Sequence, residues 1–283
     1  MELKKTLVIQ DISCVGRCSL TVALPIISAA GIETSILPTA ILSTHTGGFS
    51  GYTYRDLTDD ITPIVEHWKT LGLSFDTIYT GYLGSFEQLR LVSDIFDTFK
   101  NQQNQIIVDP AMADNGILYG GFSNDFPKGM AKLCAKADII VPNMTEAAFL
   151  LGEAYHETHD QTYVEGLLQR LLSLGCKQVV LTGISFDPAK LGVAIHNGDE
   201  ISYYFADRID GYYHGTGDIY ASTLVAAQLV SNSLKTAASI AVDYTVASIK
   251  ATLGTDRERK YGVNFEHCMP MLIQKLEAFH PTI

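Results

Sequence analysis

The sequence has 283 residues, 47% of them hydrophobic, and its 20 basic and 31 acidic residues give a net charge of −11. A chain of this length can bury a substantial core. No basic block occurs, which argues against a nucleic-acid partner, and no run approaches the ~18 apolar residues of a membrane span. Residues 1–10 lack the apolar run of a secretion signal, and the five scattered cysteines are typical of reduced thiols. We therefore expect a cytoplasmic protein without a membrane partner.

Strands and helices alternate along most of the chain, as in parallel sheets whose strands are joined by helical crossovers. Short apolar runs predict strands at 6–9, 33–37, 77–82, 106–108, 138–141 and 178–181. Apolar residues at helical spacing predict helices at 19–30, 61–71, 89–99, 164–172, 219–230 and 237–253. The segment from Pro38 to Tyr54 is rich in Gly, Thr and Ser and is predicted to be a long functional or mobile loop.

Asn197-Gly198 lies between two apolar runs, which is a strong signal for a β-hairpin. The sheet is therefore expected to gain antiparallel strands late in the chain. No linker, repeat or low-complexity segment divides the sequence, so the organisation predicts one α/β domain over residues 1–283.

Ligands of an open parallel sheet bind beyond the carboxyl ends of its strands. Polar residues that directly follow predicted strands are therefore candidates for a site. They come from distant parts of the chain and are expected to meet at one edge of the sheet: Gln10, Asp11, Asp109, Asn143, Glu146, Thr182 and the loop before Asp218.

The most distinctive motif is His214-Gly215-Thr216-Gly217-Asp218, which directly precedes a predicted apolar helix. Glycines let the backbone approach a ligand closely, and the unpaired N–H groups of a helix's first turn favour an anion. A carboxylate here can also take a proton from an acceptor hydroxyl. The motif fits equally well a turn in which Asp218 only caps the helix, and the local pattern does not decide between the two.

Asn143 and Glu146 lie three residues apart on one face of a predicted helix start. Their oxygens suit Mg²⁺, directly or through water, but the same spacing fits a capping box. Asp109 and Asp114 follow another strand end, where solvated loop acids are the simpler interpretation. His45 is interpreted as a surface or hydrogen-bonding residue rather than a catalyst.

Two common nucleotide-binding motifs are absent from the sequence. It has neither G-x-x-x-x-G-K-[ST] nor a strand-linked G-x-G-x-x-G, which disfavours a nicotinamide dehydrogenase. Any phosphate site must be built in another way.

Five segments, in order within residues 6–250, resemble pyridoxal kinases of the ribokinase-like superfamily. They are Ser43-Thr44-His45-Thr46-Gly47, Thr80-Gly81-Tyr82-Leu83-Gly84, Asp109-Pro110-Ala111-Met112-Ala113-Asp114, Asn143-Met144-Thr145-Glu146 and Gly215-Thr216-Gly217-Asp218. The resemblance implies a ribokinase-like fold with a mostly parallel central sheet flanked by helices on both faces. It also implies ATP-dependent phosphorylation of the 5′-hydroxymethyl group of pyridoxal, pyridoxine or pyridoxamine, with Mg²⁺, in a homodimer.

The resemblance also implies roles at the phosphoryl-transfer centre. Asp218 is then the base that activates the acceptor hydroxyl. The peptide N–H groups of Gly215, Thr216 and Gly217 stabilise charge on the transferred phosphoryl group. These roles fit phosphoryl transfer, in which catalysis consists mainly of positioning and charge stabilisation.

Further roles concern the nucleotide and the metal. By the same resemblance, Asp114, Asn143 and Glu146 organise the nucleotide phosphates, with Glu146 and Asp114 on the metal ion. Thr182 contacts the nucleotide phosphates.

The resemblance also places Thr46 and Tyr82 at the pyridine ring of the substrate. Pyridoxal kinases usually carry Gln-Ser-His after the first strand, and their serine binds the ring. Here Gln10-Asp11-Ile12 stands instead, so Asp11 occupies the serine's position and is expected to contact the substrate. This departure leaves the preferred B6 vitamer open.

Three alternatives to a pyridoxal kinase fit the sequence less well. Hydroxymethylpyrimidine kinases of thiamine synthesis share the fold but commonly carry cysteine in place of Asp218. A non-catalytic small-molecule sensor needs no base, so the combination of Asp218, Glu146 and Asn143 argues against it. Sugar and nucleoside kinases often have a lid of added strands, and residues 10–75 show no such insertion.

Overall fold

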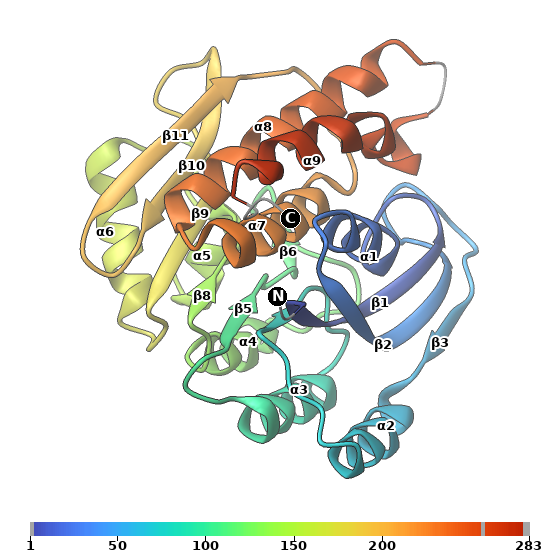
Figure 1. Cartoon of the computed structure of the whole chain (residues 1–283). Helices are drawn as coiled ribbons and strands as arrows, with labels where there is room; N and C mark the ends of the chain where they lie inside the picture. The colour runs from blue at the N-terminus through green and yellow to red at the C-terminus, as the bar shows by residue number, and fades with distance from the viewer. Residues whose placement is uncertain (1–2, 256–257, 280–283) are drawn as a thin grey trace. The chain divides into compact units, whose positions relative to one another are not determined.

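The computed structural model describes residues 3–255 and 258–279 (Figure 1). The chain forms two compact units. We call Thr58–Arg208 the continuous unit, and Met1–Leu57 together with Ile209–Ile283 the split unit. Across the described ranges, no helix combines the length and hydropathy needed to cross a membrane. The single domain expected from the sequence stays a prediction.

The continuous unit, all of whose residues are described, is built on a mostly parallel sheet in the order β11-β10-β9-β8-β5-β4. Parallel pairing joins β4 to β5, β5 to β8 and β8 to β9, whereas β10 runs antiparallel to β9 and β11. The strands are β4 (Thr77–Thr80), β5 (Gln105–Val108), β8 (Ile139–Ile140), β9 (Gln178–Ile184), β10 (Lys190–His196) and β11 (Ile201–Asp207). The predicted parallel α/β sheet and its late antiparallel hairpin are confirmed.

The helices of this unit comprise one that precedes its first strand and others that connect its parallel strands. They are α2 (Thr58–Thr70), α3 (Phe86–Phe99), α4 (Phe126–Cys134), α5 (Met144–Leu150) and α6 (Gln161–Leu172). In α3, Ser85 caps the first turn by accepting from the Gln88 N–H, and Leu89, Val92 and Phe96 bury one face. Figure 1 shows α6 beside the β9–β11 strands, and α6 contacts β9. Burial of such apolar stripes, rather than helix propensity, holds these elements in place.

The split unit combines the two ends of the chain. Its N-terminal part contains β1 (Lys5–Val15), α1 (Leu20–Ala29), β2 (Glu33–Thr44) and β3 (Tyr54–Asp56). Its C-terminal part contains α7 (Thr216–Ser231), α8 (Leu234–Leu253), the 3₁₀ turns η1 (Arg259–Tyr261) and η2 (Phe265–Cys268), and α9 (Met269–Glu277). Helix α7 packs on α1 and α8, and Figure 1 shows α7, α8 and α9 lying together.

The prediction that Pro38–Tyr54 forms one long loop is wrong. Strand β2 continues to Thr44, parallel to β1 and antiparallel to β3, so only residues 45–53 connect the strands. Ladder hydrogen bonds on both sides outweigh the polar composition that suggested a loop. Pro38 lies where the β1–β2 register shifts, between the pairs of Gln10 and Ile12, and a strand tolerates a proline at such an irregularity.

Candidate active site

The N-terminus of α7 carries no side-chain cap. Gly215 is the N-cap residue, with φ 76°, and it has no side chain to accept from the first turn. The Thr216 hydroxyl donates to the Tyr213 carbonyl at 3.2 Å, which fastens the turn. Asp218 therefore does not cap the helix, contrary to the simpler interpretation of the motif. The free N–H groups and the dipole of this 16-residue helix are suited to an anion.

Only glycine fits at position 215. A Cβ atom there would lie 2.0 Å from the Arg17 carbonyl oxygen and 3.4 Å from the Cys18 sulfur. The close approach brings the start of α7 against the segment that precedes α1. Since both segments belong to the split unit, the turn before α7 is held by packing against the N-terminal part of this unit.

We expect Gly215→Ala to lower the free energy of unfolding, by about 1–3 kcal/mol from backbone strain and further from the clash. Gly217→Ala is the matched control, because no atom lies within 4 Å of its Cβ position and its φ is not in the left-handed region. The control should raise stability by about 0.5–1 kcal/mol, as alanine does within a helix. Denaturant unfolding of both variants measures the two effects, and equal stability of the two would contradict the packing described.

Asp218 is a half-buried carboxylate in the first turn of α7. Burial raises its pKa from 3.8 to about 7; a hydrogen bond from the Ser19 peptide N–H opposes this, and the nearby Asp11 charge adds to it. The side chain remains accessible to solvent. A carboxylate with a pKa near neutrality is well matched to accept a proton at physiological pH.

Asp11 lies near Asp218 but is itself buried, with 4% of its surface exposed. Its carboxylate accepts hydrogen bonds from the Ser19 hydroxyl at 2.6 Å and the Ser13 hydroxyl at 3.2 Å. Burial raises the pKa of Asp11, while these two hydrogen bonds lower it. The structure thus brings together two carboxylates from segments about 200 residues apart in the sequence, and it adds Ser19, which the sequence patterns did not single out.

The β2–β3 loop carries His45 and Thr46 in the split unit. Gly47 donates its N–H to His45 Nδ1 at 3.2 Å, so Nε2 carries the proton and donates to the Lys260 carbonyl at 2.6 Å. Burial lowers the pKa of His45, which favours this neutral form. His45 is therefore the hydrogen-bonding residue that the sequence indicates, and it leaves the neighbouring Thr46 exposed.

His214 lies against this loop, with its ring centroid 5.1 Å from that of His45 and 4.9 Å from that of Tyr212. A Cβ atom on Gly47 would come within 2.6 Å of the His214 ring. The sequence motif included His214 without giving it a role. The packing gives His214 a structural role, because its ring holds the β2–β3 loop beside the start of α7.

In the continuous unit, Asn143 and Glu146 form a capping box at the start of α5. Each side chain accepts from the other residue's N–H at 2.9 Å. Glu146 also accepts from the Met112 N–H at 3.1 Å, and the Asn143 amide donates to the Ala113 carbonyl at 2.8 Å. The pair therefore fixes the segment from Asp109 to Asp114 against α5.

Glu146 is the most deeply buried carboxylate of this cluster, at 3% exposure. Burial raises its pKa to about 8, three peptide N–H donors lower it, and the Asp114 charge raises it further. A carboxylate so placed gains from a nearby cation, because a positive charge favours its ionised form.

Asp114 precedes a tight hairpin that links the short strands β6 (Ala113–Asp114) and β7 (Ile117–Leu118). Asn115 and Gly116 occupy the turn with φ of 50° and 78°, the pattern of a two-residue hairpin. The prediction of a loop with solvated acids is therefore wrong for Asp114, and Asn115-Gly116 is the same Asn-Gly hairpin signal as in the late hairpin. The turn holds Asp114 half-exposed.

Thr182 lies beside the capping box. Its N–H donates to the Pro142 carbonyl at 2.9 Å, and it pairs with Asn143 in a parallel bridge. Its side chain is half-buried. The structure therefore brings together Asn143, Glu146, Thr182 and Asp114 in one unit, as the rule on strand ends predicts.

Tyr82, in the segment after β4, is half-buried in an aromatic cluster. Its ring lies 5.5 Å from that of Phe122, which stacks on Phe126 at 4.0 Å. Phe122 was not predicted, because no periodic pattern surrounds it. A flat ring with a solvent-facing edge can stack on a heteroaromatic ligand.

The donor set around Asp114 and Glu146 fits Mg²⁺ held partly by water. Within residues 3–255 and 258–279, no three His, Cys, Asp or Glu side chains gather as a complete metal-binding group. Mg²⁺ does not require one, because it usually keeps several waters and takes one or two carboxylates plus phosphate oxygens. Three peptide N–H groups already bind the two Glu146 oxygens, so this carboxylate can offer a cation only its remaining lone-pair capacity, directly or through water.

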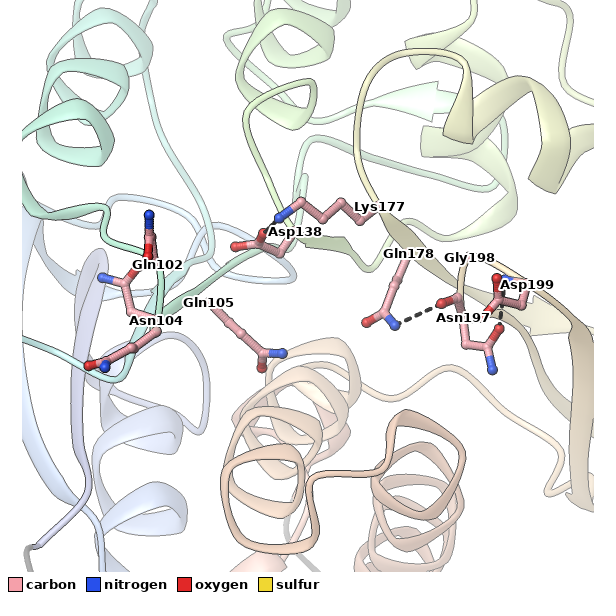
Figure 2. A pocket seen from close by; sticks show the side chains of 10 residues that line it. Gln102, Asn104, Gln105, Asp138, Lys177, Gln178, Asn197, Gly198 and Asp199 are labelled. Atoms are coloured by element: carbon pink, nitrogen blue, oxygen red, sulfur yellow. Dashed lines mark hydrogen bonds and ion pairs between the residues drawn. The ribbon is translucent and has the colours of Figure 1, made fainter.

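A separate polar pocket of about 460 Å³ opens at the amino ends of the strands of the continuous unit (Figure 2). Side-chain amides of Gln102, Asn104, Gln178 and Asn197 line it, with Asp138 beside them. Asp138 pairs with Lys100 and Lys177 and accepts from the Ile106 N–H at 2.7 Å. Burial alone would raise the pKa of Asp138, but these partners lower it below its ordinary value. The carboxylate fixes strand ends and is not poised for chemistry.

The fold and these polar clusters are those of a ribokinase-like small-molecule kinase. Residues 27–263 match the sequence model of the family described as phosphomethylpyrimidine kinase, and the chain belongs to this family.

Several known proteins resemble the whole chain. A provisionally assigned phosphomethylpyrimidine kinase of Bacteroides thetaiotaomicron, crystallised with pyridoxal, is 35% identical with a TM-score of 0.91 and 96% of each chain covered. The pyridoxal kinase of Lactobacillus plantarum is 30% identical with a TM-score of 0.90, covering 99% of this chain and 100% of its own. A pyridoxal kinase of Dictyostelium discoideum is 25% identical over 91% of each chain.

Proposed function

We propose that this protein transfers the γ-phosphoryl group of ATP to the 5′-hydroxymethyl group of pyridoxal, pyridoxine or pyridoxamine. The observation that carries the proposal is Asp218, a carboxylate with a pKa near 7 in the first turn of a helix whose leading N–H groups are uncapped. Its setting supplies a base and an anion site within one turn. The pyridoxal kinases among the relatives support the substrate class.

Asp218 acts as the base in this reaction. Its carboxylate accepts the proton of the substrate hydroxyl as the oxygen attacks the γ-phosphorus, and the bond to the β-phosphate oxygen breaks. The acceptor oxygen thus becomes a phosphate ester, and ADP leaves. A base of pKa about 7 is half ionised at neutral pH and fully available above it.

The N–H groups at the start of α7 stabilise the transferred phosphoryl group. Gly215, Thr216 and Gly217 supply them, and the helix dipole acts in the same direction. No lysine of a P-loop is needed, because backbone donors and the helix end provide the positive potential.

Asp114 and Glu146 would hold Mg²⁺, which supplies charge neutralisation on the nucleotide phosphates when bound. Asn143 keeps Glu146 in place through the capping box, and Thr182 beside it offers a hydroxyl to the phosphates. The ionised form of Glu146, disfavoured by burial, becomes favourable in this role.

Asp11, Thr46 and Tyr82 are the proposed contacts to the substrate ring. Tyr82 offers an aromatic face, and Thr46 offers a hydroxyl from the exposed β2–β3 loop. A homodimer in the cytoplasm completes the proposal, on the strength of the family resemblance alone.

An ATP-consumption assay with Mg²⁺ tests the proposal, run in parallel with pyridoxal, pyridoxine, pyridoxamine and hydroxymethylpyrimidine. Turnover on at least one B6 vitamer is expected. Turnover on hydroxymethylpyrimidine alone would assign the protein to thiamine synthesis, the alternative that the family's description favours. No turnover on any of the four would leave the sensor or a different kinase specificity.

A further inference from the structure

Ser19, the residue before α1, has an unusual backbone conformation. Its φ of 57° and ψ of −136° lie in a region that glycine tolerates and serine rarely adopts. Only 6% of the residue is exposed. A strained residue persists where its surroundings hold it on several sides, and such residues cluster at functional sites.

All three polar groups of Ser19 are engaged. Its carbonyl accepts from the N–H groups of Val22 and Ala23, both at 3.0 Å, which starts α1. Its peptide N–H donates to the Asp218 carboxylate. Its hydroxyl donates to Asp11 Oδ1 at 2.6 Å. One residue therefore links both carboxylates of the candidate site.

The hydroxyl of Ser19 does not serve the helix that it precedes. A serine at the N-cap normally accepts a hydrogen bond from the first turn, but Ser19 makes no such side-chain bond to α1. The hydroxyl is directed to Asp11 instead. A stabilising contact of α1 is thus given up in favour of the link between Ser19 and Asp11.

Asp11 is well placed to anchor this link. It lies at the shift in the β1–β2 register, is 4% exposed, and its second oxygen accepts from the Ser13 hydroxyl at 3.2 Å. In the described part of the split unit, two other titratable groups interact with the carboxylates of Asp11 and Asp218. They are Cys18, which interacts with both, and Tyr54, which interacts with Asp11. Burial and then the two carboxylates raise the pKa of the Cys18 thiol, so it stays neutral.

We propose that Ser19 and Asp11 are positioning residues for the base: the Asp11–Ser19 hydrogen bond holds the Ser19 N–H against Asp218 and so orients that carboxylate toward the acceptor hydroxyl. This inference rests on the proposed function of Asp218. Ser19 and Asp11 influence the rate through Asp218, in addition to any contact of Asp11 with substrate.

The test compares Ser19→Ala and Asp11→Asn with the wild type in the pH dependence of kcat/KM. The wild-type rate should rise with pH to a plateau, with its midpoint near the Asp218 pKa of about 7. Asp11→Asn removes a negative charge but keeps an acceptor for Ser19, so the midpoint should fall by roughly 0.5–1 pH unit. Ser19→Ala loosens the N–H donor, so the midpoint should rise and kcat should fall about 10-fold with KM within twofold.

Ser28→Ala is the matched control, because Ser28 is an exposed serine of α1 whose hydroxyl donates to Thr34, away from Asp11 and Asp218. Its kcat should stay within about twofold of wild type. Ser19→Gly relieves the strained backbone and serves if Ser19→Ala does not fold; it should show the same loss of kcat. Wild-type kcat and midpoint in both Ser19→Gly and Asp11→Asn would overturn the proposal.

Direct titration separates this inference from the proposed function. The Asp218 carboxyl can be followed by ¹³C NMR in wild type, Asp11→Asn and Ser19→Ala without any turnover. Opposite shifts of its midpoint in the two variants would support the link even if no B6 vitamer were phosphorylated. An Asp218 midpoint that stays the same in both variants would overturn it, whatever the enzyme's substrate.

Discussion

Asp218→Asn should lower kcat on a B6 vitamer by ~10²–10⁴-fold, the usual range for loss of a general base. The affinity for the vitamer should be nearly unchanged, because the amide keeps the size and shape of the carboxyl group. Steady-state kinetics and calorimetric binding measure the two quantities. Asp210→Asn, an exposed residue of the same loop, is the control and should retain the wild-type rate.

The stability of this variant distinguishes a lost base from a damaged fold. Because the pKa of Asp218 is raised from 3.8 to about 7 in the folded protein, its contribution to stability is fully present below pH 3.8 and is lost as the pH rises through 7. Asparagine is neutral throughout. The Tm of Asp218→Asn should therefore equal or exceed that of wild type at pH 8, and the two should converge near pH 4. A lower Tm at pH 8 would contradict the assignment.

Removal of the Glu146 carboxylate should lower the free energy of unfolding and raise the Mg²⁺ concentration that the reaction requires. Glu146→Ala leaves the buried N–H groups of Met112 and Asn143 without an acceptor, at a cost of about 1–3 kcal/mol for each. The Mg²⁺ concentration for half-maximal rate should rise by at least ~10–100-fold, the loss usual even for a residue that only supports a metal ligand. Thermal unfolding and a Mg²⁺ titration of the rate measure the two effects.

Glu146→Gln separates the two roles of this side chain. Glutamine keeps one oxygen as acceptor and should recover part of the stability, but it lacks the charge, so the Mg²⁺ requirement should stay high. Glu157→Gln, an exposed residue of the same unit, is the control. A normal Mg²⁺ requirement in Glu146→Gln would show that Glu146 only caps α5.

Much of the fold follows from local sequence patterns. The parallel strands of the continuous unit lie within a few residues of the predicted runs, since buried parallel strands leave continuous apolar segments. Helix α4 was missed because Pro127 and Gly129 interrupt its apolar spacing, although proline is tolerated in a first turn. Strand β3 was missed because all three of its residues are exposed and only its pairing with β2 defines it.

The candidate site was only partly predictable. Asp218, Glu146 and Asn143 lie just after predicted strands or at the starts of predicted helices, so their positions in the sequence identify them as candidate site residues. The three-residue spacing of Asn143 and Glu146 also predicts a capping box, and the structure confirms that prediction. Ser19 could not be found in this way, because its importance lies in a backbone angle and in contacts to residues that local patterns do not connect.

The division of the split unit between the two ends of the chain has a consequence for biosynthesis. Residues 58–208 form a continuous unit that can make its internal contacts before residues 209–283 have been translated. The first 57 residues can pack α1 on β1 and β2, but they must wait for α7 before α1 can complete the burial of its apolar face. Until then the α1 surface that α7 covers stays exposed, and transiently exposed apolar surface of this kind favours aggregation during folding.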